Sequence, residues 1–249
     1  MEGLVYSFFA GISMALGALI VLCFGRPGKS LLSLILGFAA GVMLAISAFD
    51  LIPEAIEMGS IWHAAAGFLV GAAMMYVLDL IIPHAHMSGD LDGPARSAGE
   101  AENSDRKALR TGYLVFLGMA LHNVPEGLAI GAGLESSPEL GFYIAVAIGL
   151  HNIPEGMATA GPLRAGGLSS AKVLLLTLLA GMMTPVGALI GLIAFGISDA
   201  FVAAGMALAA GAMVYIASDE LIPQSHGYHS HMANFGILGG FLAGFVLSG

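Results

Sequence analysis

The sequence predicts an all-α membrane protein with eight transmembrane helices in a 3+2+3 inverted-repeat arrangement and both termini extracytoplasmic. Its composition, its long apolar segments and an internal repeat lead to this fold class. Of the 249 residues, 57% are hydrophobic and only 10% are charged, whereas a soluble domain carries about 25% charged residues. The composition therefore indicates an integral membrane protein.

Eight apolar segments are long enough to cross a bilayer as helices. A helix needs roughly 20 apolar residues to span the hydrocarbon core. The 36 glycines favour helices whose backbones pack closely in lipid. The predicted spans are residues 3–25, 31–53, 61–82, 111–133, 141–161, 171–196, 201–222 and 233–248.

The positive charges predict the orientation of these spans. All eight Lys and Arg lie in the connections after the first, third and fifth spans, and the other connections carry acids only. The cations are Arg26, Lys29, Arg96, Arg106, Lys107, Arg110, Arg164 and Lys172. Because cytoplasmic loops are enriched in Lys and Arg, we expect these connections in the cytoplasm and both termini outside, in a protein of the inner or plasma membrane.

The chain also repeats itself at an offset of 170 residues. The stretch AAGVMLAISAFDLIPEA (39–55) aligns with AAGAMVYIASDELIPQS (209–225), and AGISMALGALI (10–20) aligns with AGMMTPVGALI (180–190). The first three spans therefore correspond to the last three, and the five crossings between paired helices turn the second copy upside down. Such inverted repeats are typical of transporters, whose binding site lies near the membrane midplane.

We expect a single transmembrane transporter domain over residues 1–249. The segment 84–110 is polar, rich in Gly, Ser and acids, and lacks apolar periodicity, so it is predicted to be a mobile cytoplasmic loop. The predicted parts are repeat 1 over residues 3–82, this loop, a central pair over residues 111–161 and repeat 2 over residues 171–248.

The central pair carries one hexapeptide twice, as HNVPEG (122–127) and HNIPEG (151–156). Positions i, i+1 and i+4 of a helix cluster on one side, and the proline of each copy removes a backbone donor beside them. Because the two helices are antiparallel, the His of one lies at roughly the height of the Glu of the other. The polar side chains that this brings together are His122, Asn123, Glu126, His151, Asn152 and Glu155.

The two glutamates have no internal cation to balance them, because no Lys or Arg lies deep in a predicted span. A charge near the bilayer centre costs at least about 2.5–3.5 kcal/mol, so Glu126 and Glu155 are either protonated or hold a cation. Imidazole, carboxylate and amide oxygen suit divalent metals such as Zn²⁺, Fe²⁺, Mn²⁺ or Co²⁺. The sequence therefore predicts a divalent-metal site inside the membrane.

Other partners are disfavoured by the composition. The single Cys23 cannot form an intrachain disulfide or a thiolate cluster, and the net charge of −9 argues against nucleic acid. No organic cofactor is expected. The chain is expected to be surrounded by the lipid bilayer.

The two hexapeptides on consecutive central spans, with eight spans and both ends outside, resemble the ZIP family of divalent-metal transporters, nearest its GufA-like bacterial branch. The resemblance covers essentially the whole chain and implies a homodimer with a two-metal centre bridged by the glutamates. The residues implied for the first metal are His122, Glu126, His151 and Glu155. Asn123 and Asn152, with the same glutamates, are implied for the second.

One position departs from the pattern of the family. Family members commonly add to the second metal site a Glu that precedes a Pro in the sixth span. The matching stretch here is GMMTPVGA, which puts Thr184 in that place. The second site thus has one carboxylate fewer.

The resemblance also implies a route for the metal through the membrane. The residues implied for its cytoplasmic exit are Asp79, His84, Asp219 and Glu220. Asp50 and Glu54 are the symmetry counterparts at the outer side and are expected to collect cations at the entrance. HAH (84–86) and HGYHSH (226–231) could receive the released metal, the alternative being ordinary solvated loops.

The leading hypothesis is a carrier, not an enzyme. It would move zinc, or a similar ion such as iron, manganese, cobalt or cadmium, into the cytoplasm by alternating access, with spans one, four, five and six moving against the other four. A passive channel with the same residues remains an alternative. An intramembrane zinc hydrolase lacks support because the chain has no HExxH arrangement, and the unpaired buried acids oppose a packing protein without a ligand.

Overall fold

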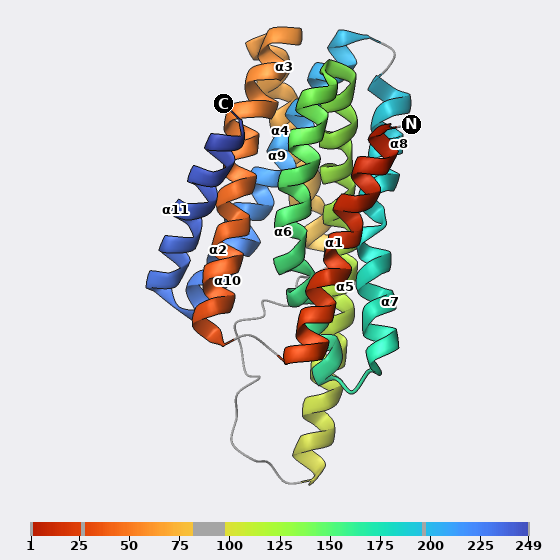
Figure 1. The fold of residues 1–249 in the computed structure, drawn as a ribbon, viewed down its shortest axis with the longest axis vertical. Helices are drawn as coiled ribbons and strands as arrows, with labels where there is room; N and C mark the ends of the chain where they lie inside the picture. Colours follow the sequence, from red (N-terminus) through yellow and green to blue (C-terminus); the bar gives the residue numbers. More distant parts are fainter. Residues whose placement is uncertain (1, 26–27, 82–97, 196–197, 249) are drawn as a thin grey trace.

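The computed structural model describes residues 2–25, 28–81, 98–195 and 198–248, whose regular secondary structure is entirely helical. The helices lie side by side in one elongated bundle (Figure 1). They are α1 (Glu2–Phe24), α2 (Lys29–Ile46), η1 (Ser47–Leu51), α3 (Ile52–Met58), α4 (Ile61–Ile81), α5 (Ala98–Ser136), α6 (Pro138–Ala165), α7 (Ser170–Gly181), α8 (Met183–Phe195), α9 (Asp199–Ile216), η2 (Ala217–Leu221), α10 (Ile222–Tyr228) and α11 (Ser230–Leu247).

Seven helical stretches in this part of the chain are long and apolar enough to cross a membrane. They are Leu4–Phe24, Lys29–Met58, Ile61–Leu80, Ala108–Ser136, Ser170–Ile193, Asp199–Tyr228 and Ser230–Leu247. Each overlaps a predicted span, although Lys29–Met58 and Asp199–Tyr228 extend past the predicted ends at residues 53 and 222. The remaining predicted span lies in α6, which is 28 residues long but contains His151, Asn152, Glu155 and internal prolines that lower its mean hydropathy. The chain is therefore a multi-pass, all-helical membrane protein.

Two helix boundaries differ from the expectation. Helix α5 begins at Ala98, inside the segment predicted as a loop, and projects beyond the rest of the bundle (Figure 1). Residues 98–110 are rich in Ala, Glu, Lys and Arg, which are strong helix formers, and extending an existing helix requires no new nucleus. The predicted sixth span is interrupted at Met182, between α7 and α8, shortly before the helix-breaking Pro185.

The repeat seen in the sequence recurs in the helix boundaries. The elements α2, η1 and α3 begin at residues 29, 47 and 52, and the elements α9, η2 and α10 begin at 199, 217 and 222, which is 170 residues later in each case. Both η elements are π-helical turns that end two residues before a proline, Pro53 and Pro223 respectively. A proline cannot donate to the carbonyl four residues earlier, and a widened turn is one way for a helix to accommodate this loss.

The two repeated units run in opposite directions through the bundle. Ser33, near the start of α2, donates a hydrogen bond to the carbonyl oxygen of Ser225 in α10 at 2.7 Å. At the other end, Gly59 after α3 packs against Ala203 near the start of α9. Each unit therefore begins beside the end of the other (Figure 1).

Glycines bring particular helix pairs into backbone contact. A Cβ added at Gly156 would overlap the backbone of Met14, where α6 meets α1, and one at Gly127 would overlap the backbone of Thr184, where α5 meets α8. Gly11 on α1 and Gly181 on α7 approach each other in the same way. Together with the α5–α6 pair, these contacts join α1, α5, α6, α7 and α8 into a group that we call the central group.

The other helices have close contacts of the same kind with each other. A Cβ added at Gly240 on α11 would overlap the backbone of Phe38 on α2, and one at Gly211 on α9 would overlap the backbone of Phe68 on α4. We call α2, α4, α9 and α11 the outer group. Small residues at helix contacts are the usual means by which transmembrane helices pack closely in lipid.

Two adjacent glycines of α11 provide a matched test of this packing. Gly240→Ala forces a methyl group into the backbone of Phe38, so we expect it to lower the stability of the purified protein by about 1–3 kcal/mol, as overpacking does elsewhere. Gly239 is exposed and a Cβ there meets no atom within 4 Å, so Gly239→Ala should leave the thermal midpoint unchanged or slightly higher. Equal midpoints for the two variants would contradict the close α2–α11 contact.

Candidate metal centre

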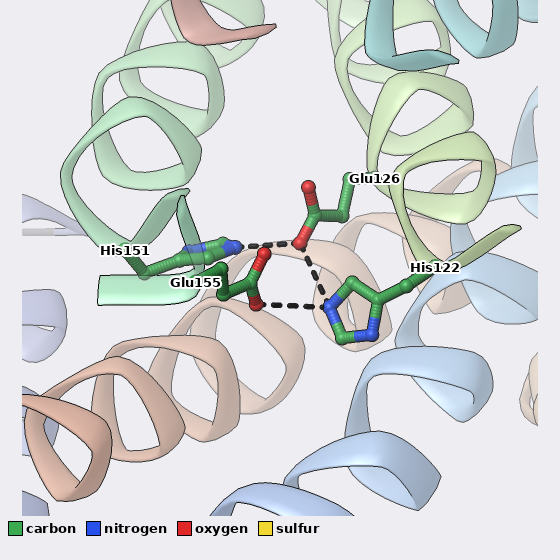
Figure 2. Close-up of side chains that lie close together, drawn as sticks. All are labelled: His122, Glu126, His151 and Glu155. Carbon is green, nitrogen blue, oxygen red and sulfur yellow. Dashed lines mark hydrogen bonds and ion pairs between the residues drawn. The ribbon is translucent and has the colours of Figure 1, made fainter. Parts of the chain in front are cut away.

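Four ionisable side chains meet where α5 and α6 cross the middle of the bundle. They are His122 and Glu126 from α5, and His151 and Glu155 from α6. Each offers a ligand atom, these atoms all lie within 4.8 Å of one another, and no side chain of the four is more than 2% exposed. Figure 2 shows them pointing toward one another between the two helices.

The distances within this cluster are those of direct contacts. His151 Nε2 lies 2.6 Å from Glu126 Oε1, and His122 Nε2 lies 3.1 Å from both Glu126 Oε1 and Glu155 Oε1. The predicted approach of each His to the Glu of the other helix is thus present. The single Nε2 of His122 can donate only one proton, so it cannot satisfy both carboxylates at once.

Local sequence explains why the four side chains converge. In each hexapeptide the His and the Glu are four residues apart, which places them on the same face of the helix. Helices α5 and α6 are joined by a tight turn in which Ser137 caps α6, its Oγ accepting from the backbone N–H of Leu140 at 3.1 Å. This turn fixes the antiparallel register, so the two polar faces meet at the same depth.

The cluster holds more acceptor oxygen than the protein satisfies. Oε2 of Glu126 and Oε2 of Glu155 are buried without a hydrogen-bond partner, and Glu155 Oε1 has the 3.1 Å ion-pair contact with His122 but no hydrogen bond. Among the side chains that the structure describes, no Lys or Arg is buried, so the only side chains beside the two glutamates that can carry a positive charge are the imidazoles of His122 and His151. Buried carboxylates are paired or coordinate metals in folded proteins.

This donor set suits a divalent ion. Two imidazole nitrogens and two carboxylate oxygens are the number and kind of ligands that Zn²⁺ takes in tetrahedral sites, at about 2.0–2.2 Å from the metal. Tetrahedral ligands at that distance are about 3.4 Å from one another, so the present contacts of 2.6 and 3.1 Å need to open only slightly. The cluster could therefore enclose one ion with small side-chain movements.

The asparagines of the two hexapeptides lie beside this cluster and contact other helices. Asn152 Nδ2 donates to the carbonyl of Ala10 on α1 at 3.1 Å. Asn123 Nδ2 donates to the carbonyl of Ala180 on α7 at 3.0 Å. Thr184 is fully buried, and its Oγ1 donates to Asn123 Oδ1 at 3.3 Å.

The residues expected at the entrance each have a serine partner. Ser248 Oγ donates to Asp50 Oδ2 at 2.7 Å, and Ser136 Oγ donates to Glu54 Oε1. Sequence reasoning did not identify these serines. They lie 198 and 82 residues from their acids, and an isolated serine at a helix end carries no distinctive pattern.

The structure brings together part of the predicted exit route. Asp79 on α4 and Asp219 in η2 both lie near Tyr215 on α9. The ring of Tyr215 lies 6.4 Å from that of Tyr76 on α4. Glu220 accepts from Gln224 Nε2 at 3.4 Å. His84 and the whole HAH stretch lie outside the described residues.

The histidines of HGYHSH have contacts within the protein. His226 contacts the carbonyl of Ile222 at 3.0 Å and Asn234 Oδ1 at 3.1 Å. His229 caps α11 by accepting from the backbone N–H of Met232 at 3.4 Å. These two histidines therefore stabilise the connection between α10 and α11.

The fold and the site define the class of this protein: it is a multi-pass helical membrane protein with a buried His and Glu cluster suited to a metal ion. Comparison with known proteins leads to the same class. The model of the family described as "ZIP Zinc transporter" matches residues 2–111 and 89–248. The chain belongs to the ZIP family, which is a family of transporters rather than of enzymes.

Several relatives named as zinc transporters match nearly the whole chain. The zinc transporter GufA of Myxococcus xanthus is 38% identical, over 98% of this chain and 97% of the relative. The zinc transporter ZupT of Corynebacterium efficiens is 36% identical, over 94% and 91% respectively. ZupT of Chlorobium chlorochromatii is 35% identical, over 97% and 92%.

If the cluster binds zinc, zinc should stabilise the folded protein. At a free concentration of about 100 times the Kd, a ligand that binds only the folded state adds about 2.7 kcal/mol, so we expect zinc to raise the thermal midpoint of the purified protein. Glu126→Ala should abolish this rise. His63→Ala is the matched control, because His63 is exposed and bonded to Ser60. A rise that persists in Glu126→Ala would place the zinc elsewhere.

Proposed function

We propose that this chain carries divalent transition-metal ions, zinc foremost and also iron, manganese, cobalt or cadmium, into the cytoplasm by alternating access. The ion binds to His122, Glu126, His151 and Glu155 during its passage. The observation that carries this proposal is the buried set of four ligands in which no Lys or Arg balances the glutamates. The relatives named as zinc transporters support zinc as the principal cargo.

In this proposal α6 is the eighth transmembrane helix. It lies against α1 and α5 along the bundle, and its polar residues face the cluster instead of lipid. The matching boundaries of the repeated units support a 3+2+3 inverted repeat within one transporter domain. The location of the Lys and Arg residues supports cytoplasmic connections after the first, third and fifth spans, with both termini outside.

Alternating access requires one part of the protein to move against another. The central group carries all four ligands and is held together by backbone contacts at its glycines. The outer group has its own glycine contacts. The central group therefore moves as one unit against the outer group and exposes the ion to each side in turn, in a chain that we take to be one half of a homodimer.

The remaining acids form the ends of the route. Asp50 and Glu54 attract cations at the outer side, and the exit residues accept the ion on the cytoplasmic side. Asp79 on α4 and Asp219 in η2 support this because both lie near Tyr215 on α9. The proposed exit residues are Asp79, His84, Asp219 and Glu220.

Zinc uptake into proteoliposomes that contain the purified protein tests the function. We expect uptake that saturates with zinc concentration and is lost in both Glu126→Ala and His151→Ala, because each removes a ligand from the only pathway proposed. His63→Ala should transport like the wild type. Uptake that rises linearly without saturation would contradict a carrier and favour a channel, and uptake retained by both variants would contradict the proposed site.

Metal binding should weaken as the pH falls. The two carboxylates and two imidazoles bind metal only when deprotonated, so protons compete with zinc for the same atoms. We expect the zinc Kd, measured by equilibrium dialysis, to rise progressively between about pH 8 and pH 5, by up to about tenfold per unit for each proton displaced. A Kd that stays flat over this range would contradict displacement of protons by the metal.

A further inference from the structure

The two asparagines occupy the same position in the two hexapeptides but have different surroundings. Asn123 Nδ2 lies 2.9 Å from the carbonyl of Met119, 3.0 Å from that of Ala180 and 3.1 Å from Sδ of Met14. Its Oδ1 accepts from Thr184 Oγ1 at 3.3 Å. Both polar atoms of Asn123 are therefore engaged by the protein, and these partners come from α1, α5, α7 and α8.

The break between α7 and α8 explains why Asn123 finds these partners. The last carbonyls of a helix have no partner within it, and Ala180 lies in the last turn of α7. The amide of Asn123 supplies a donor to this carbonyl, while Thr184 in the first turn of α8 supplies a donor to the Asn123 oxygen. Asn123, which follows His122 on α5, is thus hydrogen-bonded to both α7 and α8.

Asn152 has only one of its two polar atoms engaged. Its Nδ2 donates to the carbonyl of Ala10 at 3.1 Å, whereas its Oδ1 is buried without a hydrogen-bond partner. A buried amide oxygen without a partner is unfavourable unless something else satisfies it. Asn152 directly follows His151 in α6, so this unpartnered oxygen lies in the same helical turn as one of the ligands of the cluster.

The charges of the site set the number of ions. Glu126 and Glu155 are the buried acids among the described side chains, so one divalent ion balances them when both are ionised. A second divalent ion would leave two uncompensated positive charges in a site surrounded by lipid and protein, which is strongly unfavourable.

We propose that Asn123 is a positioning residue that binds no metal, whereas Asn152 Oδ1 is an additional ligand in a centre that holds one ion per chain. This proposal rests on the proposed metal site. It departs from the expectation that both asparagines serve a second ion. Thr184 donates to the oxygen that Asn123 would need for that role and stands where the family pattern has a Glu, so the α5 side of the centre contributes only His122 and Glu126.

The first test is the number of zinc ions bound by the purified, metal-stripped full-length protein, measured by equilibrium dialysis and elemental analysis. We expect one ion per chain in the wild type and none in His151→Ala at the same zinc concentration. Two ions bound within the site would overturn the proposal. If the wild-type protein bound no zinc, both this proposal and the proposed metal site would be overturned. The same holds if His151→Ala bound zinc as the wild type does.

The second test compares the two asparagines with cobalt as a spectroscopic probe. The visible absorption of bound Co²⁺ depends on the number and geometry of its ligands. We expect Asn152→Ala to change this spectrum and to weaken zinc binding by about tenfold or more. Asn123→Ala should keep the wild-type spectrum but lower the thermal midpoint of the metal-free protein, since it removes ties to three other helices. The reverse pattern would overturn the proposal.

Thr184→Val keeps the test decisive even if Asn123→Ala does not fold. This variant retains the shape of the side chain and removes only the hydroxyl bonded to Asn123. We expect a lower thermal midpoint, one bound ion and a zinc Kd within about threefold of the wild type, because binding does not involve Asn123. A tighter Kd or a second bound ion would show that the released Asn123 oxygen is a metal ligand. Loss of transport with one ion still bound would overturn only the proposed function.

Discussion

The site of this protein depends on two carboxylates that are buried in a membrane-spanning bundle, with no Lys or Arg among the buried side chains that the structure describes. Among the described residues, the ionisable groups in contact with Glu126 and Glu155 are the imidazoles of His122 and His151. Several of the cluster's oxygen and nitrogen atoms find no partner in the protein. An isolated charge in such surroundings is costly, so the ionised cluster is incomplete until a cation enters it. The rest of the bundle holds four ligand atoms close enough together to accept one.

Backbone packing is what allows polar helices to be enclosed in this way. Gly127 and Gly156, inside the hexapeptides, let α8 and α1 approach the backs of the helices that carry the ligands. Asn123 and Asn152 then tie the same helices to α7 and α1 through backbone carbonyls. Each hexapeptide therefore supplies both the ligands and the contacts that hold them. A chain that keeps His and Glu but loses the glycine would have the ligands without the enclosure.

Much of this arrangement follows from the sequence, because it depends on local periodicity. The His and Glu spacing, the repetition of the hexapeptide and the antiparallel pairing of adjacent spans predicted that the four side chains meet. Features that depend on distant neighbours could not be predicted. The partners of Asn123 include Met14 and Ala180, which lie 109 and 57 residues away. The π-helical turns are one way in which a helix adjusts its backbone before a proline. A kink is another, and the sequence is equally compatible with both.

The π-helical turn at Ser47–Leu51 determines which neighbours Asp50 and Glu54 contact at this end of the bundle. In a regular helix Asp50 and Glu54 would face the same neighbour, but a widened turn adds about one residue and rotates the rest of the helix by roughly 100°. Asp50 accordingly reaches Ser248, beyond the end of α11, whereas Glu54 reaches Ser136 at the end of α5. The Asp50–Ser248 bond joins η1, which follows α2, to the end of α11, and α2 and α11 both belong to the outer group. The Glu54–Ser136 bond joins α3 to α5, which belongs to the central group. Any sliding of α5 past α3 must break that second bond, so the bond opposes relative movement of these two helices at this end of the bundle.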